Sequence, residues 1–381
     1  MESSTGRHYP ALDHLRALAA FMVFAWHFMH GANGYPLPFS ENPAFAPLAL
    51  FDEGHVGVAL FMTLSGYLFA KLTYGKRLSY TKFLFNRILR LLPLLSIVIF
   101  TPLLWHHANN TITPQELFQK LNNLFFGFIY PLWPNGAWSI AVELQFYFIF
   151  PFLLLLQRRS VWWLVMTLLG AIALRTLYHH HNGQVQQLAY LTLIGRIDQF
   201  ILGIIFYQWQ SFIIKRKFLV LLTAAILIWF YSWFNAVGGF YNYPAYPSSS
   251  AIWIFIPTIE GLCFAILIAW YDGRKAQAAP SKISRAIAHT GKLSYSIYLL
   301  HFFVVFWIAD NIHRHLFSIN NPYIALAAAL CCYLALLPLF HLSYTIFERP
   351  FLKFRKPYLI ETSISTESNS QSQLTQHNRV I

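Results

Sequence analysis

An arginine and a histidine interrupt the first long apolar stretch of the chain. Residues 12–30 are almost continuously apolar, but they include Arg16, with Asp13 three positions before it, and His27. On an α-helix, the eleven positions between Arg16 and His27 give about 1,100° of rotation, roughly 20° past three turns, so both side chains project from one face. They lie roughly 16 Å apart along the axis. One helix face therefore presents a cation at one depth and an imidazole, a potential base or nucleophile, at another.

A second group of cations follows at Arg87 and Arg90, which are one helical turn apart in the sequence NRILRLLP. Guanidinium groups bind phosphates through paired hydrogen bonds, so these two arginines together with Arg16 could clamp the phosphates of a nucleotide-like donor. A structural alternative exists for each: Arg16 could simply pair with Asp13, and the other two could extend to lipid headgroups.

A polar stripe and a second histidine lie in later apolar segments. Ser139, Glu143 and Tyr147 recur every four residues, and His301 lies about halfway along the segment 291–309. An unpaired glutamate in hydrocarbon costs several kcal/mol, so Glu143 should meet a cation, a hydroxyl group or an imidazole. His27 and His301 could instead be structural histidines that bond to neighbouring carbonyl groups.

The composition identifies the environment of these residues. The chain has 381 residues, of which 57% are hydrophobic and only 11% are charged, less than half the charged fraction of a typical soluble domain. We therefore expect a polytopic membrane protein. The net charge of +13 is explained by basic loops between apolar segments, so nucleic acid is not an expected partner. Cys263, Cys331 and Cys332 lie within apolar runs, which predicts no structural disulfide.

Ten apolar runs are long enough to span a bilayer, which predicts an all-α bundle of about ten transmembrane helices. These runs are residues 11–30, 56–73, 83–104, 139–156, 161–178, 188–208, 217–236, 251–270, 291–309 and 322–346. We expect residues 1–356 to form one membrane domain and the Ser/Thr/Gln-rich residues 357–381 to be a disordered cytoplasmic tail.

Loop charges predict the orientation of the bundle. Lysine and arginine concentrate in alternate loops, whereas the loops on the opposite side contain only Lys120 and Arg314. The positive-inside rule then places both termini in the cytoplasm. This orientation assigns the three arginines to the inner half of the membrane. It assigns the imidazoles and the stripe to the central and outer half, a group that contains His27, Ser139, Glu143 and His301. Group transfer from an inner anionic donor to an outer hydroxyl acceptor would use both groups.

In order and spacing, these residues resemble the membrane-bound acyltransferase family 3, over a region from about Asp13 to Pro350. The resemblance rests on the Arg-x10-His element at 16 and 27, the Gly-Val-x-Leu-Phe…Leu-Ser-Gly-Tyr block at 57–67, Arg-x-x-Arg at 87–90, Trp-Ser-x-x-x-Glu-x-Gln-Phe-Tyr at 138–147, Ser-Tyr-x-x-Tyr-Leu-x-His at 294–301 and Glu-Arg-Pro at 348–350. Two positions depart from the family pattern: Ala59 replaces a frequent Asp, and Leu144 replaces a frequent second Glu.

The resemblance implies an integral membrane O-acyltransferase of the cell inner membrane. Such an enzyme moves an acyl group, most often acetyl, from cytoplasmic acyl-CoA to a hydroxyl of an extracytoplasmic carbohydrate such as a surface polysaccharide, O-antigen or exopolysaccharide. Acyl-CoA is then a co-substrate, and no bound cofactor or metal is expected. Membrane lipid, acyl-CoA and the glycan are the expected partners. The alternative class is a transporter or flippase for a lipid-linked sugar or small anion.

The resemblance also implies roles for the residues. His27 would be the general base on the acceptor hydroxyl or would relay the acyl group, and Glu143 would orient the imidazole or bind sugar hydroxyls. Arg16, Arg87 and Arg90 would bind the CoA phosphates. The remaining candidates would support the acceptor side, namely Asp13, Ser139, Tyr147 and His301.

Overall fold

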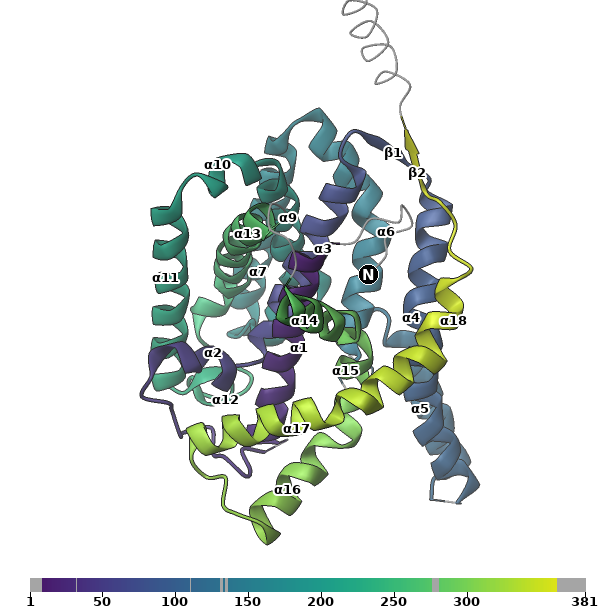
Figure 1. The fold of residues 1–381 in the computed structure, drawn as a ribbon, viewed down its shortest axis with the longest axis vertical. Helices are drawn as coiled ribbons and strands as arrows, with labels where there is room; N and C mark the ends of the chain where they lie inside the picture. The colour runs from purple at the N-terminus through teal and green to yellow at the C-terminus, as the bar shows by residue number, and fades with distance from the viewer. Residues whose placement is uncertain are drawn as a thin grey trace, which may run out of the picture.

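The computed structural model describes residues 9–31, 33–109, 111–130, 133, 136–275 and 281–361 (Figure 1). The long helices are α1 (Pro10–His30), α3 (Val56–Thr73), α4 (Tyr80–Ala108), α6 (Trp138–Arg159), α7 (Val161–Asn182), α9 (Leu193–Gln208), α11 (Lys217–Ala236), α13 (Ile256–Lys275) and α17 (Pro322–Ser343). The shorter helices are α2 (Ala49–Asp52), α5 (Pro114–Phe126), α8 (Gln186–Leu191), α10 (Gln210–Ile214), α12 (Gly239–Asn242), α14 (Lys282–Lys292), α15 (Ser294–Leu300), α16 (Val305–His315) and α18 (Arg349–Leu352). Single turns of 3₁₀ helix cover Ala46–Leu48, Ala251–Ile254 and His301–Phe303, and a π-helical turn covers Tyr344–Glu348.

The all-α character predicted from the sequence is confirmed, because every predicted apolar run contains helix. Within the described residues, seven helices are long and apolar enough to cross a membrane. An eighth span results if the segments Ser294–Phe303 and Val305–His315, which meet at an angle of 57°, count as one broken crossing. The chain is therefore a multi-pass membrane protein. The number of about ten spans and the cytoplasmic location of both termini remain predictions.

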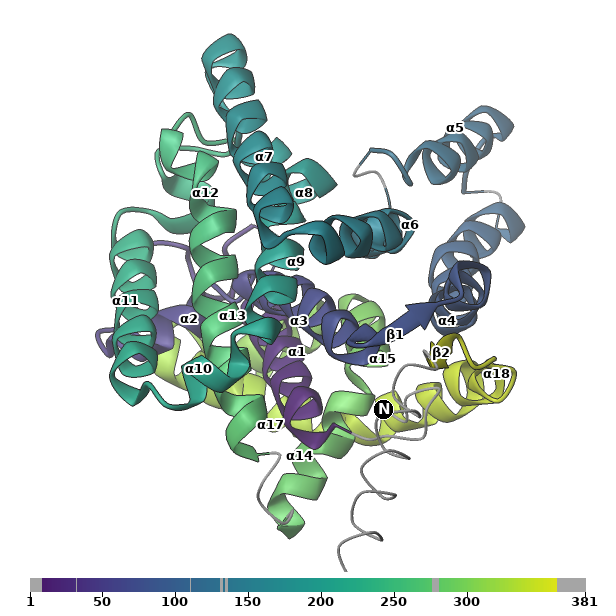
Figure 2. The ribbon, with the colours of Figure 1, turned by 90° about the horizontal axis from the view of Figure 1, so that it is seen from above.

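Helices α1, α3 and α9 form the buried centre of the bundle (Figure 2). Glycines allow α3 and α9 to approach each other closely. A side chain at Gly66 would lie 2.1 Å from the backbone oxygen of Phe200, and one at Gly203 would lie 2.3 Å from that of Thr63. Small residues are a common basis for helix packing in membranes, where apolar side chains gain little by leaving lipid for another helix. The tight centre fixes the relative height of the helices that carry the polar residues.

Two segments outside the predicted membrane-spanning runs contain regular structure. Strand β2 (Leu359–Glu361) pairs in antiparallel fashion with β1 (Lys76–Leu78), so the predicted tail is ordered at its start. Backbone hydrogen bonds to β1 explain this order, which the composition of the segment does not reveal. The rest of the predicted tail, residues 362–381, lies outside the described residues. Helix α5 lies in the predicted loop 105–137.

Candidate active site

A cavity between α1, α3, α4, α6 and α15 brings together six of the predicted site residues. Its volume is about 690 Å³ when the space at its mouth is counted. The predicted residues that line it are Arg16, Arg87, Arg90, Ser139, Glu143 and Tyr147. Ser65, Ser294, Tyr295 and Tyr298 contribute further polar groups to its wall. The sequence thus identified most of the charged lining, although its members come from three different helices.

Arg16 and Arg87 are buried in the cavity wall and contact neighbouring side chains. Arg16 is 8% exposed and donates from Nη1 to Oδ1 of Asp13 at 2.9 Å. Arg87 is 5% exposed, and its guanidinium carbon lies 5.2 Å and 5.6 Å from the ring centres of Phe69 and Phe83. Its Nε has no hydrogen-bond partner among the described residues. Since a buried donor without a partner is costly, the guanidinium of Arg87 is suited to an anion that enters the cavity.

Glu143 belongs to the arginine cavity. Its carboxylate accepts hydrogen bonds from Ser65 Oγ, at 3.1 Å, and from the hydroxyl of Tyr147. Among the described residues, no contact joins Glu143 to His27. The expectation that Glu143 meets a cation, a hydroxyl group or an imidazole is thus met by two hydroxyl groups in the arginine cavity. Its position in the outer half of the membrane and its role toward His27 stay predictions. The sequence shows which face of a helix a residue occupies, but the height of one helix relative to another depends on packing.

The height of the cavity follows from the packing of α3 against α1. A side chain at Gly57 would lie 2.6 Å from the backbone oxygen of Ala19 and 3.0 Å from Val23, which places the start of α3 beside the second half of α1. Ser65 is eight residues further along α3, about 12 Å toward the start of α1. Glu143, which bonds to Ser65, is consequently close to the level of Arg16.

His27 and His301 form a pair outside the cavity wall. Nδ1 of His27 lies 3.3 Å from Nε2 of His301 and 2.9 Å from the backbone oxygen of Val23. Nδ1 of His301 lies 3.0 Å from the backbone oxygen of Ile297. A carbonyl oxygen can only accept a hydrogen bond, so in the neutral rings Nδ1 carries the proton. Nε2 of His27 is then unprotonated and can act as a base or nucleophile.

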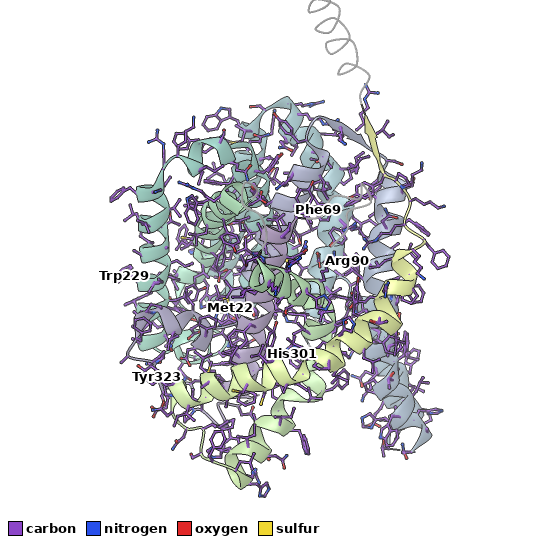
Figure 3. The ribbon with its side chains drawn as sticks, in the orientation of Figure 1. Met22, Phe69, Arg90, Trp229, His301 and Tyr323 are labelled. Carbon is purple, nitrogen blue, oxygen red and sulfur yellow. The ribbon has the colours of Figure 1, made fainter. Side chains whose placement is uncertain are left out.

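Tyr298 connects the cavity to the histidine pair. Ser139 Oγ donates to the hydroxyl of Tyr298 at 2.7 Å, and this hydroxyl donates to the backbone oxygen of Gly136 at 3.0 Å. The ring centres of Tyr298 and His301 are 6.0 Å apart. Figure 3 shows Arg90 nearer the β1–β2 end of the molecule and His301 nearer the α16 end. The polar groups therefore follow one another along the long axis.

The sequence analysis did not include Ser65 and Tyr298 among the site residues. Ser65 precedes Gly66 in an apolar run, a pattern that equally fits a small residue for helix packing. Tyr298 lies one turn before His301 on the same stretch, so its spacing was the available signal.

Comparison with known proteins agrees with this arrangement. Residues 9–342 match the family model of the acyltransferase 3 family, described as an acyltransferase domain. A Bacillus subtilis (strain 168) protein named "Putative peptidoglycan O-acetyltransferase YrhL" is 31% identical over 172 residues, which cover 39% of this chain and 24% of that protein. The match thus spans about a quarter of the length of this relative. No solved structure matches the chain. The family match extends over nearly all of the chain, which therefore belongs to the acyltransferase 3 family and carries an acyltransferase domain.

Proposed function

We propose that this enzyme moves an acyl group, acetyl in the simplest case, from cytoplasmic acyl-CoA to a hydroxyl of an extracytoplasmic glycan, and that it does so in the cell inner membrane. The observation that carries the proposal is the connection of an arginine-lined cavity, through Tyr298, to a histidine pair with an available Nε2. The name of the Bacillus relative supports a glycan as the acceptor and acetyl as the group.

The donor would lie along the cavity. Arg87 and Arg90 would bind its phosphates, because guanidinium groups match phosphate oxygens and the Nε of Arg87 has no hydrogen-bond partner in the part of the chain that the structure describes. Glu143 and Ser139 offer acceptor oxygens to the amide N–H groups of the pantetheine arm. The arm would extend past Tyr298, so that the thioester approaches His27. Binding at a distance from the reacting atoms would fix the orientation of the thioester.

The histidine pair would perform the transfer. Nε2 of His27 removes the proton from the acceptor hydroxyl, and the hydroxyl oxygen attacks the thioester carbonyl. The tetrahedral intermediate collapses with loss of the CoA thiolate. The imidazolium then returns the proton to the sulfur, so the products are an ester and free CoA. His301, through its contact with Nδ1 of His27, would hold the ring in the required tautomer.

The bent pair of segments Ser294–Phe303 and Val305–His315 bears on the alternative function, a transporter. The bend of 57° at Val304 is a feature that transporters also use, where interrupted helices surround a substrate. In that function, the arginine cavity would bind an anion that crosses the membrane unchanged.

One experiment separates the two functions. The purified chain is reconstituted in vesicles with acetyl-CoA labelled in the acetyl group on one side and peptidoglycan fragments on the other. The proposed function predicts label in ester linkage to the glycan, released by mild alkali. Label that crosses the membrane while still in its thioester would contradict it and support transport.

A further inference from the structure

Helix α5 carries an apolar stripe that no other described part of the chain buries. Five of its residues fall within about 120° of the helix circumference. They are Leu117, Phe118, Leu121, Leu124 and Phe125. None of the residues in α5 is buried, and Phe118 and Phe125 are 66% and 78% exposed. So large an apolar stripe on one face is typical of a surface that contacts a partner or a membrane.

Apart from its last residue, Phe126, the opposite face of α5 is polar and has no net charge. It carries Gln119, Lys120 and Asn123 together with Glu116. At the helix start, Thr113 Oγ1 accepts a hydrogen bond from the backbone N–H of Glu116 at 3.2 Å, while the Glu116 carboxylate accepts one from the backbone N–H of Thr113 at 2.7 Å. This capping box stabilises the helix locally. The helix is thus amphipathic without depending on packing against the bundle.

The chain after α5 is attached to a membrane-spanning helix. The side-chain amide of Gln145, in α6, donates to the backbone oxygen of Phe128. The ring of Phe128 packs edge-on against that of Phe148 at a centroid distance of 5.9 Å. Gln145 lies seven residues after the start of α6 at Trp138, about 10 Å along the helix axis. The segment that follows α5 therefore lies beside α6, about 10 Å along that helix from its N-terminal end.

The stripe also continues an apolar surface. The end of α4 exposes Leu104 and Trp105, and α6 exposes Phe148 and Phe152. Figures 1 and 2 both show α5 at the periphery, next to the end of α4 and away from the central helices. Because α4 and α6 are among the candidate membrane spans, their exposed apolar side chains face lipid.

From this continuity we propose that α5 is a membrane-surface helix, with its apolar stripe in the acyl-chain region of the leaflet that surrounds the α4 C-terminus and its polar face toward water. Lipid is the partner that matches the stripe, since α5 lies at the periphery next to the end of α4, and both α4 and α6 expose apolar side chains of candidate membrane spans. The balanced charges of Glu116 and Lys120 mean that zwitterionic lipid suffices, in contrast to helices that need anionic headgroups.

Spin labels on the two faces of α5 test the proposal. Cys263, Cys331 and Cys332 are first replaced by alanine, and a nitroxide is attached at Phe125→Cys or, as the matched control, at Asn123→Cys. Both positions are exposed, so the labels should leave the fold intact. Collision rates with oxygen, which concentrates in lipid, and with a water-soluble nickel chelate are measured in phosphatidylcholine vesicles.

We expect the label at 125 to collide several-fold more with oxygen than with the nickel chelate, relative to the label at 123, which should show the opposite preference. Equal access of the chelate to both positions would show that the stripe faces water and would overturn the proposal. A label at 125 that neither reagent reaches, with a dipolar coupling to a second label, would show that another copy of the chain covers the stripe, which also overturns it.

Discussion

The arginine cavity and the histidine pair differ in what surrounds their polar groups. Three arginines and Glu143 share one cavity, where aromatic rings hold the Arg87 guanidinium and its Nε has no partner in the described residues. The two imidazoles instead bond to each other and to backbone carbonyl groups. The first arrangement suits the binding of a charged ligand, and the second suits a proton transfer at one nitrogen. Under the proposed function, donor binding and acyl transfer would therefore occupy different heights in the bundle.

Replacement of His27 by alanine should have the largest effect. It removes the unprotonated Nε2 that is proposed as the general base, so we expect transfer to fall by roughly a thousand-fold, within the range known for general bases. Binding of CoA, measured by calorimetry, should be unchanged because the cavity is intact. The exposed His106 provides the control, since its replacement by alanine should leave both quantities as they are. Substantial acyl transfer by the His27→Ala variant would show that the histidine pair does not carry out the chemical step.

Replacement of Arg87 by lysine should change donor binding and leave the chemical step almost intact. Lysine keeps the charge but lacks the planar guanidinium that packs against the rings of Phe69 and Phe83. We expect the KM for acetyl-CoA to rise about ten- to a hundred-fold, as for the loss of a charged hydrogen bond, with kcat within a few-fold. Steady-state kinetics at saturating acceptor measure this split. The control is the replacement of the exposed Arg159 by lysine. An unchanged donor KM in the Arg87 variant would show that Arg87 does not bind the donor.

The variant Glu143→Gln tests the difference between the cavity and the histidine pair. In the structure Glu143 lines the cavity, whereas the sequence groups it with His27. If Glu143 serves the cavity, the donor KM should change about ten-fold while kcat is nearly constant, since the amide keeps the shape but loses the charged acceptor. If it acts on His27, kcat should fall and the donor KM should hold. The same kinetics therefore test whether this carboxylate belongs to binding or to chemistry.

Replacement of Tyr298 by phenylalanine should have the smallest effect. The ring beside His301 remains, and only the hydroxyl that bonds to Ser139 and Gly136 is lost. One neutral hydrogen bond contributes about 0.5–1.5 kcal/mol, which corresponds to a two- to ten-fold loss in kcat/KM. The variant Tyr323→Phe, in the exposed start of α17, is the control. A loss of a hundred-fold or more would mean that the hydroxyl takes part in the reaction itself.

The sequence predicted the helices and most of the polar residues because these depend on local patterns. The Asp13–Arg16 pair and the stripe of Ser139, Glu143 and Tyr147 follow from a period of about four residues. It did not predict that Glu143 faces the arginines, since that depends on how α6 is offset against α1 and α3. Helix α5 was not predicted because the search for apolar runs long enough to span a bilayer passes over a shorter amphipathic segment, although the stripe has helical spacing.

The proposed function depends most on where the phosphates and the acyl group of the donor bind. An electron cryo-microscopy structure of the chain with a non-hydrolysable acetyl-CoA analogue would locate both. We expect the phosphates at Arg87 and Arg90 and the acyl carbon near Nε2 of His27. The acceptor oxygen should fit between this carbon and Nε2, about 3–3.5 Å from the carbon. Phosphates bound away from both arginines, or an acyl group that stops beside Glu143, would contradict the proposed function.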